Sequence, residues 1–171
     1  MIEQFEIFDE WGRSKGLMPR PQVHLSGEWH KATQVFVYNS NGELLLQRRS
    51  SEKDLFPNCW DSSVGEHLKP GESYLQGAVR GVSEELGIVG VELLPVGGER
   101  RLRMEGGDYL DYEMQQAFCC QYDGVLVPQR EEVAELKWVD RHGLDRLLAI
   151  AEFTPWFHHH RQSYDLFSSL S

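Results

Sequence analysis

The chain of 171 residues has few cysteines, few basic residues relative to acidic ones and no long hydrophobic run. Its three cysteines, Cys59, Cys119 and Cys120, are odd in number and two are adjacent, which gives neither a disulfide framework nor the spacing of a zinc site. No stretch approaches the ~18 consecutive apolar residues of a membrane-spanning helix. The acidic N-terminal segment also lacks the apolar region of a signal peptide. We therefore expect a cytoplasmic protein with reduced thiols.

Acidic residues dominate the charge: 27 Asp and Glu against 17 Lys and Arg give a net charge of −10. Such a surface repels the phosphates of nucleic-acid polymers and anionic membranes, so we expect neither as a partner. A few Arg or Lys side chains and metal ions would still allow a small phosphorylated ligand to bind. No linker, repeat or low-complexity segment divides the chain, which favours a single domain over residues 1–171 and leaves the oligomeric state open.

Apolar patterns and turn residues predict a mixture of strands and helices. Two hairpins are expected, at residues 3–16 and at residues 32–49, the second turning at Asn41 and Gly42. Further strands are predicted at residues 60–66, 91–104, 108–122 and 134–140, and helices at residues 143–153 and 155–170, besides a central helix that starts after Ser73. The run His158 to His160 is expected on a helix surface. Strands around one central helix, with helices at the end of the chain, favour an α/β/α sandwich over a mixed β-sheet.

The most informative segment is residues 65–88, GEHLKPGESYLQGAVRGVSEELGI. A Pro-Gly turn leads to Glu72, Ser73 can cap the following helix, and Gly87 is suited to end it. One buried stripe is predicted from apolar residues at spacings of three and four, namely Leu75, Val79, Val82 and Leu86. The segment is therefore predicted to form a short turn followed by an amphipathic helix.

The polar face of this helix carries the chemistry. Glu84 and Glu85 can present two carboxylates at one rim, which suits Mg²⁺ because this ion takes oxygen ligands and keeps part of its water. Arg80 lies four residues before Glu84 and can orient a carboxylate or contact a substrate. A solvated helix face would explain an isolated pair of glutamates, but not the turn, the arginine and the terminal glycine in one register.

This spacing resembles the Nudix box, G-x5-E-x7-R-E-U-x-E-E-x-G-U, where U is a bulky aliphatic residue. The matching positions are Glu72, Arg80, Val82, Glu84, Glu85, Gly87 and Ile88. Two positions depart from the pattern: Glu66 stands at the leading Gly, and Gly81 stands at the first Glu of the R-E-U-x-E-E run. The resemblance implies the Nudix α/β/α fold and a divalent-cation site on the helix.

Over residues 3–165 the chain is also similar to type I isopentenyl diphosphate isomerases and the Nudix hydrolases related to them. In the isomerases a metal ion is held by the counterparts of His24, His30, His67, Asp111 and Glu113, although the two early histidines are one residue closer together here. The catalytic cysteine of the isomerases corresponds to Gly65, which offers no acid or base for moving a proton on carbon. Hydrolysis is therefore expected in preference to isomerisation.

The expected activity is a Mg²⁺-dependent pyrophosphohydrolase, with Mn²⁺ as the alternative cation, acting on nucleoside di- or triphosphates. A metal-activated water would attack the phosphoanhydride and release a nucleoside monophosphate. The predicted metal ligands are Glu84, Glu85, Glu66, Asp111 and Glu113. The predicted catalytic residues are Glu85, Glu84, Arg80 and His67, and the predicted substrate-binding residues are Arg48, Arg49, Lys53 and Trp60. Two alternatives remain open: an isomerase-like enzyme, and an impaired nucleotide-binding module that lacks a box carboxylate at Gly81.

Overall fold

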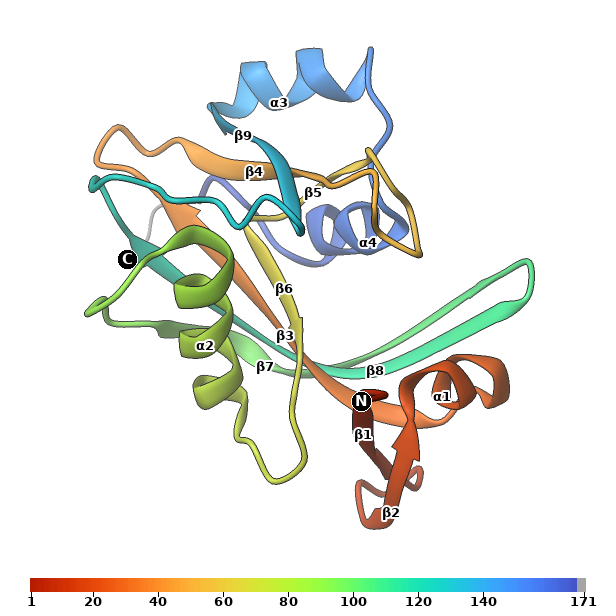
Figure 1. Cartoon of the computed structure of the whole chain (residues 1–171). Helices are drawn as coiled ribbons and strands as arrows, with labels where there is room; N and C mark the ends of the chain where they lie inside the picture. Colours follow the sequence, from red (N-terminus) through yellow and green to blue (C-terminus); the bar gives the residue numbers. More distant parts are fainter. Residues whose placement is uncertain (169–171) are drawn as a thin grey trace.

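The structure, a computed structural model, describes residues 1–168, which form a mixed β-sheet and four helices (Figure 1). The strands are β1 (Gln4–Phe8), β2 (Ser14–Pro19), β3 (Trp29–Tyr38), β4 (Leu44–Arg49), β5 (Trp60–Asp61), β6 (Val64–His67), β7 (Leu94–Gly106), β8 (Tyr109–Gln121) and β9 (Val133–Val139). The helices are α1 (Arg20–Ser26), α2 (Tyr74–Leu86), α3 (Arg141–Leu148) and α4 (Pro155–Ser163). The predicted α/β class with a mixed sheet is confirmed.

Strand β3 is the centre of the sheet. It pairs in parallel with β8 and antiparallel with β1 and β6, and β8 continues into the long hairpin with β7. The predicted hairpin at residues 32–49 forms its tight turn, but β3 and β4 share only the pair Tyr38–Leu44. The two strands separate because β4 pairs instead with β9 and β5. Ser63, just before β6, joins the two strands where they separate, because its hydroxyl accepts from Val37 N–H and donates to the Leu45 carbonyl.

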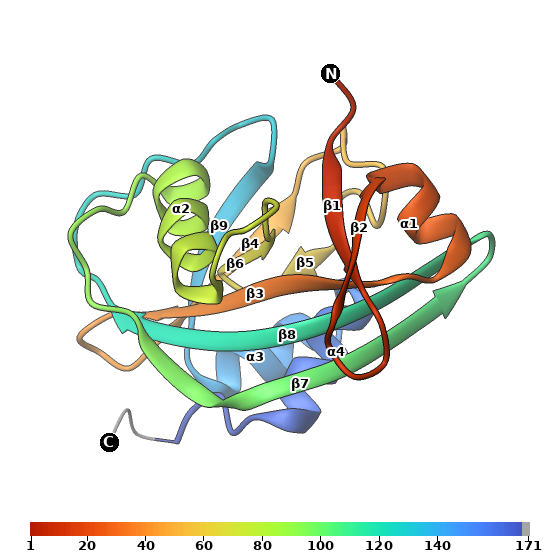
Figure 2. The same cartoon turned by 90° about the horizontal axis from the view of Figure 1, so that it is seen from below.

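Side chains of β3 alternate between two hydrophobic cores. Val35 faces one side and packs in the core that contains Val82 and Leu86 of α2. Phe36 faces the other side and packs in the core that contains Phe157 of α4. Figure 2 shows α2 on one side of β3 and β8 and the helices α3 and α4 on the other. The predicted α/β/α layering follows from this alternation.

Helix α2 begins and ends where the sequence predicts. The Ser73 hydroxyl accepts the Gln76 N–H at 3.2 Å, and the Gln76 side chain accepts the Ser73 N–H at 2.9 Å, which is a capping box. Gly87 ends the helix in the left-handed conformation, with φ at 70°. These contacts satisfy backbone groups at both ends of the helix.

The predicted buried stripe of α2 is only half correct. Val82 and Leu86 are buried, but Leu75 and Val79 are 48% and 49% exposed. The helix instead presents small residues to β6, and Gly81 lies directly against the strand. The prediction from the positions of apolar residues was therefore wrong about which side of the helix packs on the sheet.

Three helices at the periphery differ from the sequence-based expectation. Helix α3 ends at Leu148 rather than near residue 153. The short helix α1, which begins at Arg20 with a proline at its first turn, has no predicted counterpart. Helix α4 ends at Ser163 rather than near residue 170, and residues 169–170 of that prediction lie outside the described residues. Within residues 1–168 no helix has the length and hydrophobicity needed to cross a membrane.

Candidate metal centre and active site

A cavity of about 280 Å³ opens between the box helix, the strands β3, β6 and β8, and the ends of α1 and α4. Most of the side chains predicted from the sequence line it: Arg49, Lys53, Glu66, His67, Arg80, Glu84, Glu85, Asp111 and Glu113. These residues are up to 64 positions apart in the sequence, since they run from residue 49 to residue 113. The fold thus collects the predicted cation, phosphate and proton-transfer groups around one space.

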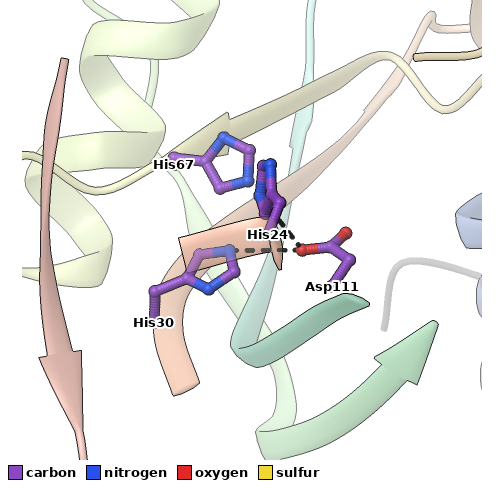
Figure 3. A group of neighbouring side chains, drawn as sticks. All are labelled: His24, His30, His67 and Asp111. Atoms are coloured by element: carbon purple, nitrogen blue, oxygen red, sulfur yellow. Dashed lines mark ion pairs between the residues drawn. The ribbon is translucent and has the colours of Figure 1, made fainter. Parts of the chain in front are cut away.

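Three histidines and an aspartate form a cluster at the cavity (Figure 3), and all of them except the fully buried His30 line it. One ligand atom each from His24, His30, His67 and Asp111 lies within 4.8 Å of the others. The Nε2 atoms of His24 and His30 lie 3.6 and 3.2 Å from Asp111 Oδ1. His67 Nε2 lies 3.3 Å from an oxygen of Glu113. The four residues come from α1, β3, β6 and β8, so the tertiary fold assembles this histidine cluster.

The donors of the histidine cluster fit a bound cation. The Nε2 atoms of its three histidines and Oδ1 of Asp111 are buried and lack a hydrogen-bond partner. Four unsatisfied polar atoms are costly unless a ligand completes them. Burial lowers the pKa of His24 and His67, which keeps these imidazoles neutral with a lone pair available. Imidazole ligands favour transition metals such as Zn, Fe or Ni over Mg²⁺.

Neighbouring groups orient the cluster. His30 Nδ1 donates to the Glu28 carbonyl at 3.0 Å, which directs Nε2 toward Asp111. Trp156 Nε1 donates to the other oxygen of Asp111 at 2.7 Å. Supporting hydrogen bonds of this kind set the tautomer and direction of metal ligands. Asp111 and Glu113, both among the predicted metal ligands, are almost fully buried.

The carboxylates of the box helix also line the cavity. Glu85 is 7% exposed and accepts a hydrogen bond from Gln47 at 2.9 Å. Burial, reinforced by the charge of Glu66, raises the pKa of Glu85 to about 8. Glu84 is half-exposed at the mouth. In the described chain these carboxylates do not converge as tightly as the histidine cluster. Mg²⁺ needs only one or two carboxylates because waters and phosphates complete its coordination, so an open rim suits it.

Arg80 organises this rim. Its guanidinium makes a two-point contact with Glu72, with both N–O distances at 2.9 Å. It also donates to the His67 carbonyl at 2.9 Å and lies 3.2 Å from Glu66 and 3.4 Å from Glu84. Of the two roles open from the sequence, this geometry supports the orientation of carboxylates, because the guanidinium is largely engaged by the protein.

Basic side chains cover the remaining side of the cavity. Arg49 and Lys53 line it as predicted, and Arg49 also lies over the Trp156 ring at 5.5 Å. Arg20 lines it too, with a buried Nε that has no partner, and sequence reasoning missed it. Arg20 precedes His24 by four residues in α1, so a predicted helix there would have placed both on one face.

Two predicted substrate residues lie away from the cavity. Arg48 points to the opposite side of β4 from Arg49 and donates to Glu135 on β9 at 3.1 Å. Trp60 is 6% exposed and packs in the core beneath α3 and α4. The alternation of β4 and the burial of β5 account for both positions.

The expectation for the histidine run of α4 is wrong at one residue. His160 is fully buried, where its ring nitrogens lie 3.0 Å from Gln115 Oε1 and 3.3 Å from Ser62 Oγ. Burial lowers the pKa of His160 to about 3. This histidine joins α4 to the sheet as a neutral group.

Gly65 borders the cavity where the isomerases carry their thiol. A Cβ atom at Gly65 would lie 3.2 Å from Oε1 of Gln34. Gln34 is itself held by a 2.7 Å hydrogen bond to the Val64 carbonyl. The three cysteines, all within the described residues, are absent from the cavity lining. The amide of Gln34 thus lies next to the position of the missing thiol.

The chain belongs to the NUDIX domain family, whose model matches residues 28–159. Over 156 residues it is 33% identical to an isopentenyl-diphosphate Delta-isomerase of Mycolicibacterium vanbaalenii, with 88% of this chain and 84% of that protein covered. Over 131 residues it is 35% identical to an uncharacterised Nudix hydrolase of Listeria monocytogenes, with 77% and 75% covered. The crystal structure of DR0079 from Deinococcus radiodurans matches with a TM-score of 0.75 at 22% identity, over 95% of this chain and 99% of that one.

These similarities confirm the predicted Nudix family and its likeness to isomerase-type relatives. The likeness to DR0079, at 22% identity, shows the shared fold alone. Since the similar proteins include both isomerases and hydrolases by name, the reaction must be argued from the site of this chain.

Proposed function

We propose that this chain is a divalent-cation-dependent Nudix hydrolase that cleaves the phosphoanhydride of nucleoside di- or triphosphates to the monophosphate. The observation that carries the proposal is the composition of the cavity. Carboxylates of the box helix and basic side chains line the same cavity, while Gly65, which also lines it, contributes no acid or base. Such a site suits the transfer of a phosphoryl group to water better than proton transfer on carbon.

Glu84 and Glu85 would hold the cation of the helix rim together with phosphate oxygens of the substrate. When bound, a divalent cation there supplies charge neutralisation of the phosphate and acidifies water. The three histidines and Asp111 would hold a second cation, one that prefers imidazole nitrogen as a ligand. Glu113 lies next to His67 in this cluster. Both ligand sets face the same cavity.

The basic side chains would bind the phosphates. Arg49, Lys53 and Arg20 lie on the cavity wall and would offer charged donors to phosphate oxygens. To do so, Arg49 would exchange its contact with the Leu55 carbonyl, and Lys53 its pair with Glu132, for the phosphate. A water oxygen attacks phosphorus, the P–O–P bond breaks, and phosphate or pyrophosphate leaves with the bonding electrons. A rim carboxylate or His67 accepts the proton that the water loses. Arg80 would act indirectly by holding Glu66, Glu72 and Glu84.

An isopentenyl diphosphate isomerase is the second candidate. The complete histidine cluster and the names of several relatives favour it. Gly65 argues against it, because the thiol that would move a proton on carbon is missing and Gln34 lies beside its position.

One assay separates these candidates. The protein is incubated with Mg²⁺ or Mn²⁺ and a panel of nucleoside di- and triphosphates, nucleotide sugars and isopentenyl diphosphate, and products are identified by ³¹P and ¹H NMR. Release of a nucleoside monophosphate is the expected result. Formation of dimethylallyl diphosphate would replace the proposal with the isomerase. Nucleotide binding without any product would replace it with an impaired binding module.

A further inference from the structure

The two departures from the box pattern are reciprocal and lie in contact. Glu66 occurs where the pattern has Gly, and Gly81 occurs where the pattern has Glu. In the fold, Glu66 belongs to β6 and Gly81 to α2, and these two elements pack directly on each other. A glutamate and a glycine have therefore exchanged sides across one strand–helix contact.

Sterics explain why both positions change together. A Cβ atom at Gly81 would lie 3.2 Å from Cβ and 3.6 Å from Cγ of Glu66. It would also lie 2.9 Å from Cγ1 of Val64, closer than real side chains approach. The stem of Glu66 thus occupies the space through which a side chain at position 81 would extend. A glycine at position 66 would remove this part of the obstruction and leave the contact with Val64.

The carboxylate of Glu66 lies near Glu84 and Glu85, where a glutamate at position 81 would also place its carboxylate. A residue at 81 lies four positions before Glu85, on the same helix face. The Glu66 carboxylate lines the same cavity as Glu84 and Glu85. It lies 3.2 Å from the Arg80 guanidinium, which also contacts Glu84 at 3.4 Å.

We propose that Glu66 replaces the missing box glutamate as a ligand of the helix cation, so that this carboxylate is delivered from strand β6 instead of helix α2. The inference rests on the proposed function only in that Glu84 and Glu85 hold that cation. It also gives a reason for a glycine in a helix interior, which is otherwise unfavourable. If the box glutamate at position 81 had simply been lost, the presence of a glutamate at position 66 would be unexplained.

The competing explanation is that Glu66 serves only as a structural partner of Arg80. Cation binding distinguishes the two without any substrate. The histidine cluster is first disabled with His24→Ala and Asp111→Asn together, which leaves two of its four donors, and Mn²⁺ binding to the rim is then measured by electron paramagnetic resonance and calorimetry. In this background Glu66→Gln keeps the shape of the side chain and an oxygen for Arg80 but removes the charge. Glu135→Gln, on an exposed residue of β9 outside the cavity, is the matched control.

We expect Glu66→Gln to weaken Mn²⁺ binding by about 10-fold or more, and Glu135→Gln to leave it unchanged. The exchange itself is then reversed. Glu66→Gly should weaken binding to a similar extent, and Glu66→Gly combined with Gly81→Glu should recover most of it. Because Val64 also crowds position 81, the same pair is made with Val64→Ala, which clears the remaining contact. Gly81→Glu alone should give no gain, since Glu66 still occupies the space.

Equal Mn²⁺ affinity in Glu66→Gln and Glu135→Gln would overturn the inference. So would a reversed pair that is folded by circular dichroism yet binds no better than Glu66→Gly in both Val64 backgrounds. These outcomes differ from failure of the proposed function, which is seen as absence of hydrolysis by the wild type. If Glu85→Gln weakens Mn²⁺ binding while Glu66→Gln does not, the rim site stands and only the exchange is refuted.

Discussion

Gly81→Ala should destabilise the protein even though alanine is the better helix former. In an open helix interior the substitution would stabilise by about 1 kcal/mol. Here the new Cβ would lie 2.9 Å from Val64 Cγ1 and 3.2 Å from Glu66 Cβ. Val64 is fully buried and, being β-branched, has little freedom to move aside. Overpacking of this kind costs about 1–3 kcal/mol, so the expected net loss is about 1 kcal/mol.

Urea denaturation of matched variants measures this effect. Gly77→Ala on the same helix is the control, because its Cβ would meet the Cδ1 end of Leu68 at 3.0 Å, and a leucine tip can rotate away. Gly81→Ala should therefore be less stable than both the wild type and Gly77→Ala. The loss of unfolding free energy caused by Val64→Ala should be smaller in the Gly81→Ala background than in the wild type. A Gly81→Ala variant that is more stable than the wild type would refute the steric argument for the contact between α2 and β6.

Three further predictions concern other parts of the site and core. His24→Ala should weaken Zn²⁺ binding at the histidine cluster by about 10-fold or more in calorimetry; an unchanged stoichiometry and affinity would exclude His24 as a ligand. His160 has a pKa of about 3 when folded and an ordinary value of 6.5 when unfolded. Between these values the unfolded chain binds one more proton, so this histidine lowers stability by about 1.4 kcal/mol for each pH unit below 6. His160→Gln should lose less stability than the wild type between pH 6 and pH 5 in urea denaturation, and parallel losses would contradict the burial argument. Gly65→Cys should form no dimethylallyl diphosphate from isopentenyl diphosphate, because the new side chain meets Gln34 at 3.2 Å; efficient isomerisation by this variant would show that only the thiol was missing.

Local signals made the box helix predictable. The cap at Ser73 and the left-handed Gly87 depend on neighbouring residues only, and the structure has both as expected. The burial of Leu75 and Val79 was misjudged because it depends on how closely β6 approaches the helix. That approach selects the side carrying Gly81, and no pattern within the helix encodes it.

The histidine cluster required long-range information. Parallel pairing of β3 with β8 places His30 opposite Glu113, and antiparallel pairing with β6 brings His67 to the same end. His24 reaches the cluster through α1, a helix of seven residues with too little periodicity to be predicted. The resemblance to isomerases indicated these residues, whereas residue patterns alone did not. Trp60 was predicted to bind substrate but lies in the core. An aromatic side chain suits either place, so the residue type alone does not decide between them.

The most direct test of the account is the Mg²⁺ dependence of hydrolysis in Glu85→Gln. Glu85 is buried at the cavity rim and held by Gln47, whose side-chain amide can still hydrogen-bond a glutamine oxygen, so the fold should persist. The rate of nucleoside monophosphate release is measured against Mg²⁺ concentration for the wild type, Glu85→Gln and the control Glu135→Gln. We predict a loss of about 100-fold or more in Glu85→Gln alone, because the ion loses a charged ligand where the transition state gains negative charge. Hydrolysis by Glu85→Gln at the wild-type rate, with the same Mg²⁺ dependence, would contradict the assignment of this cavity as the active site.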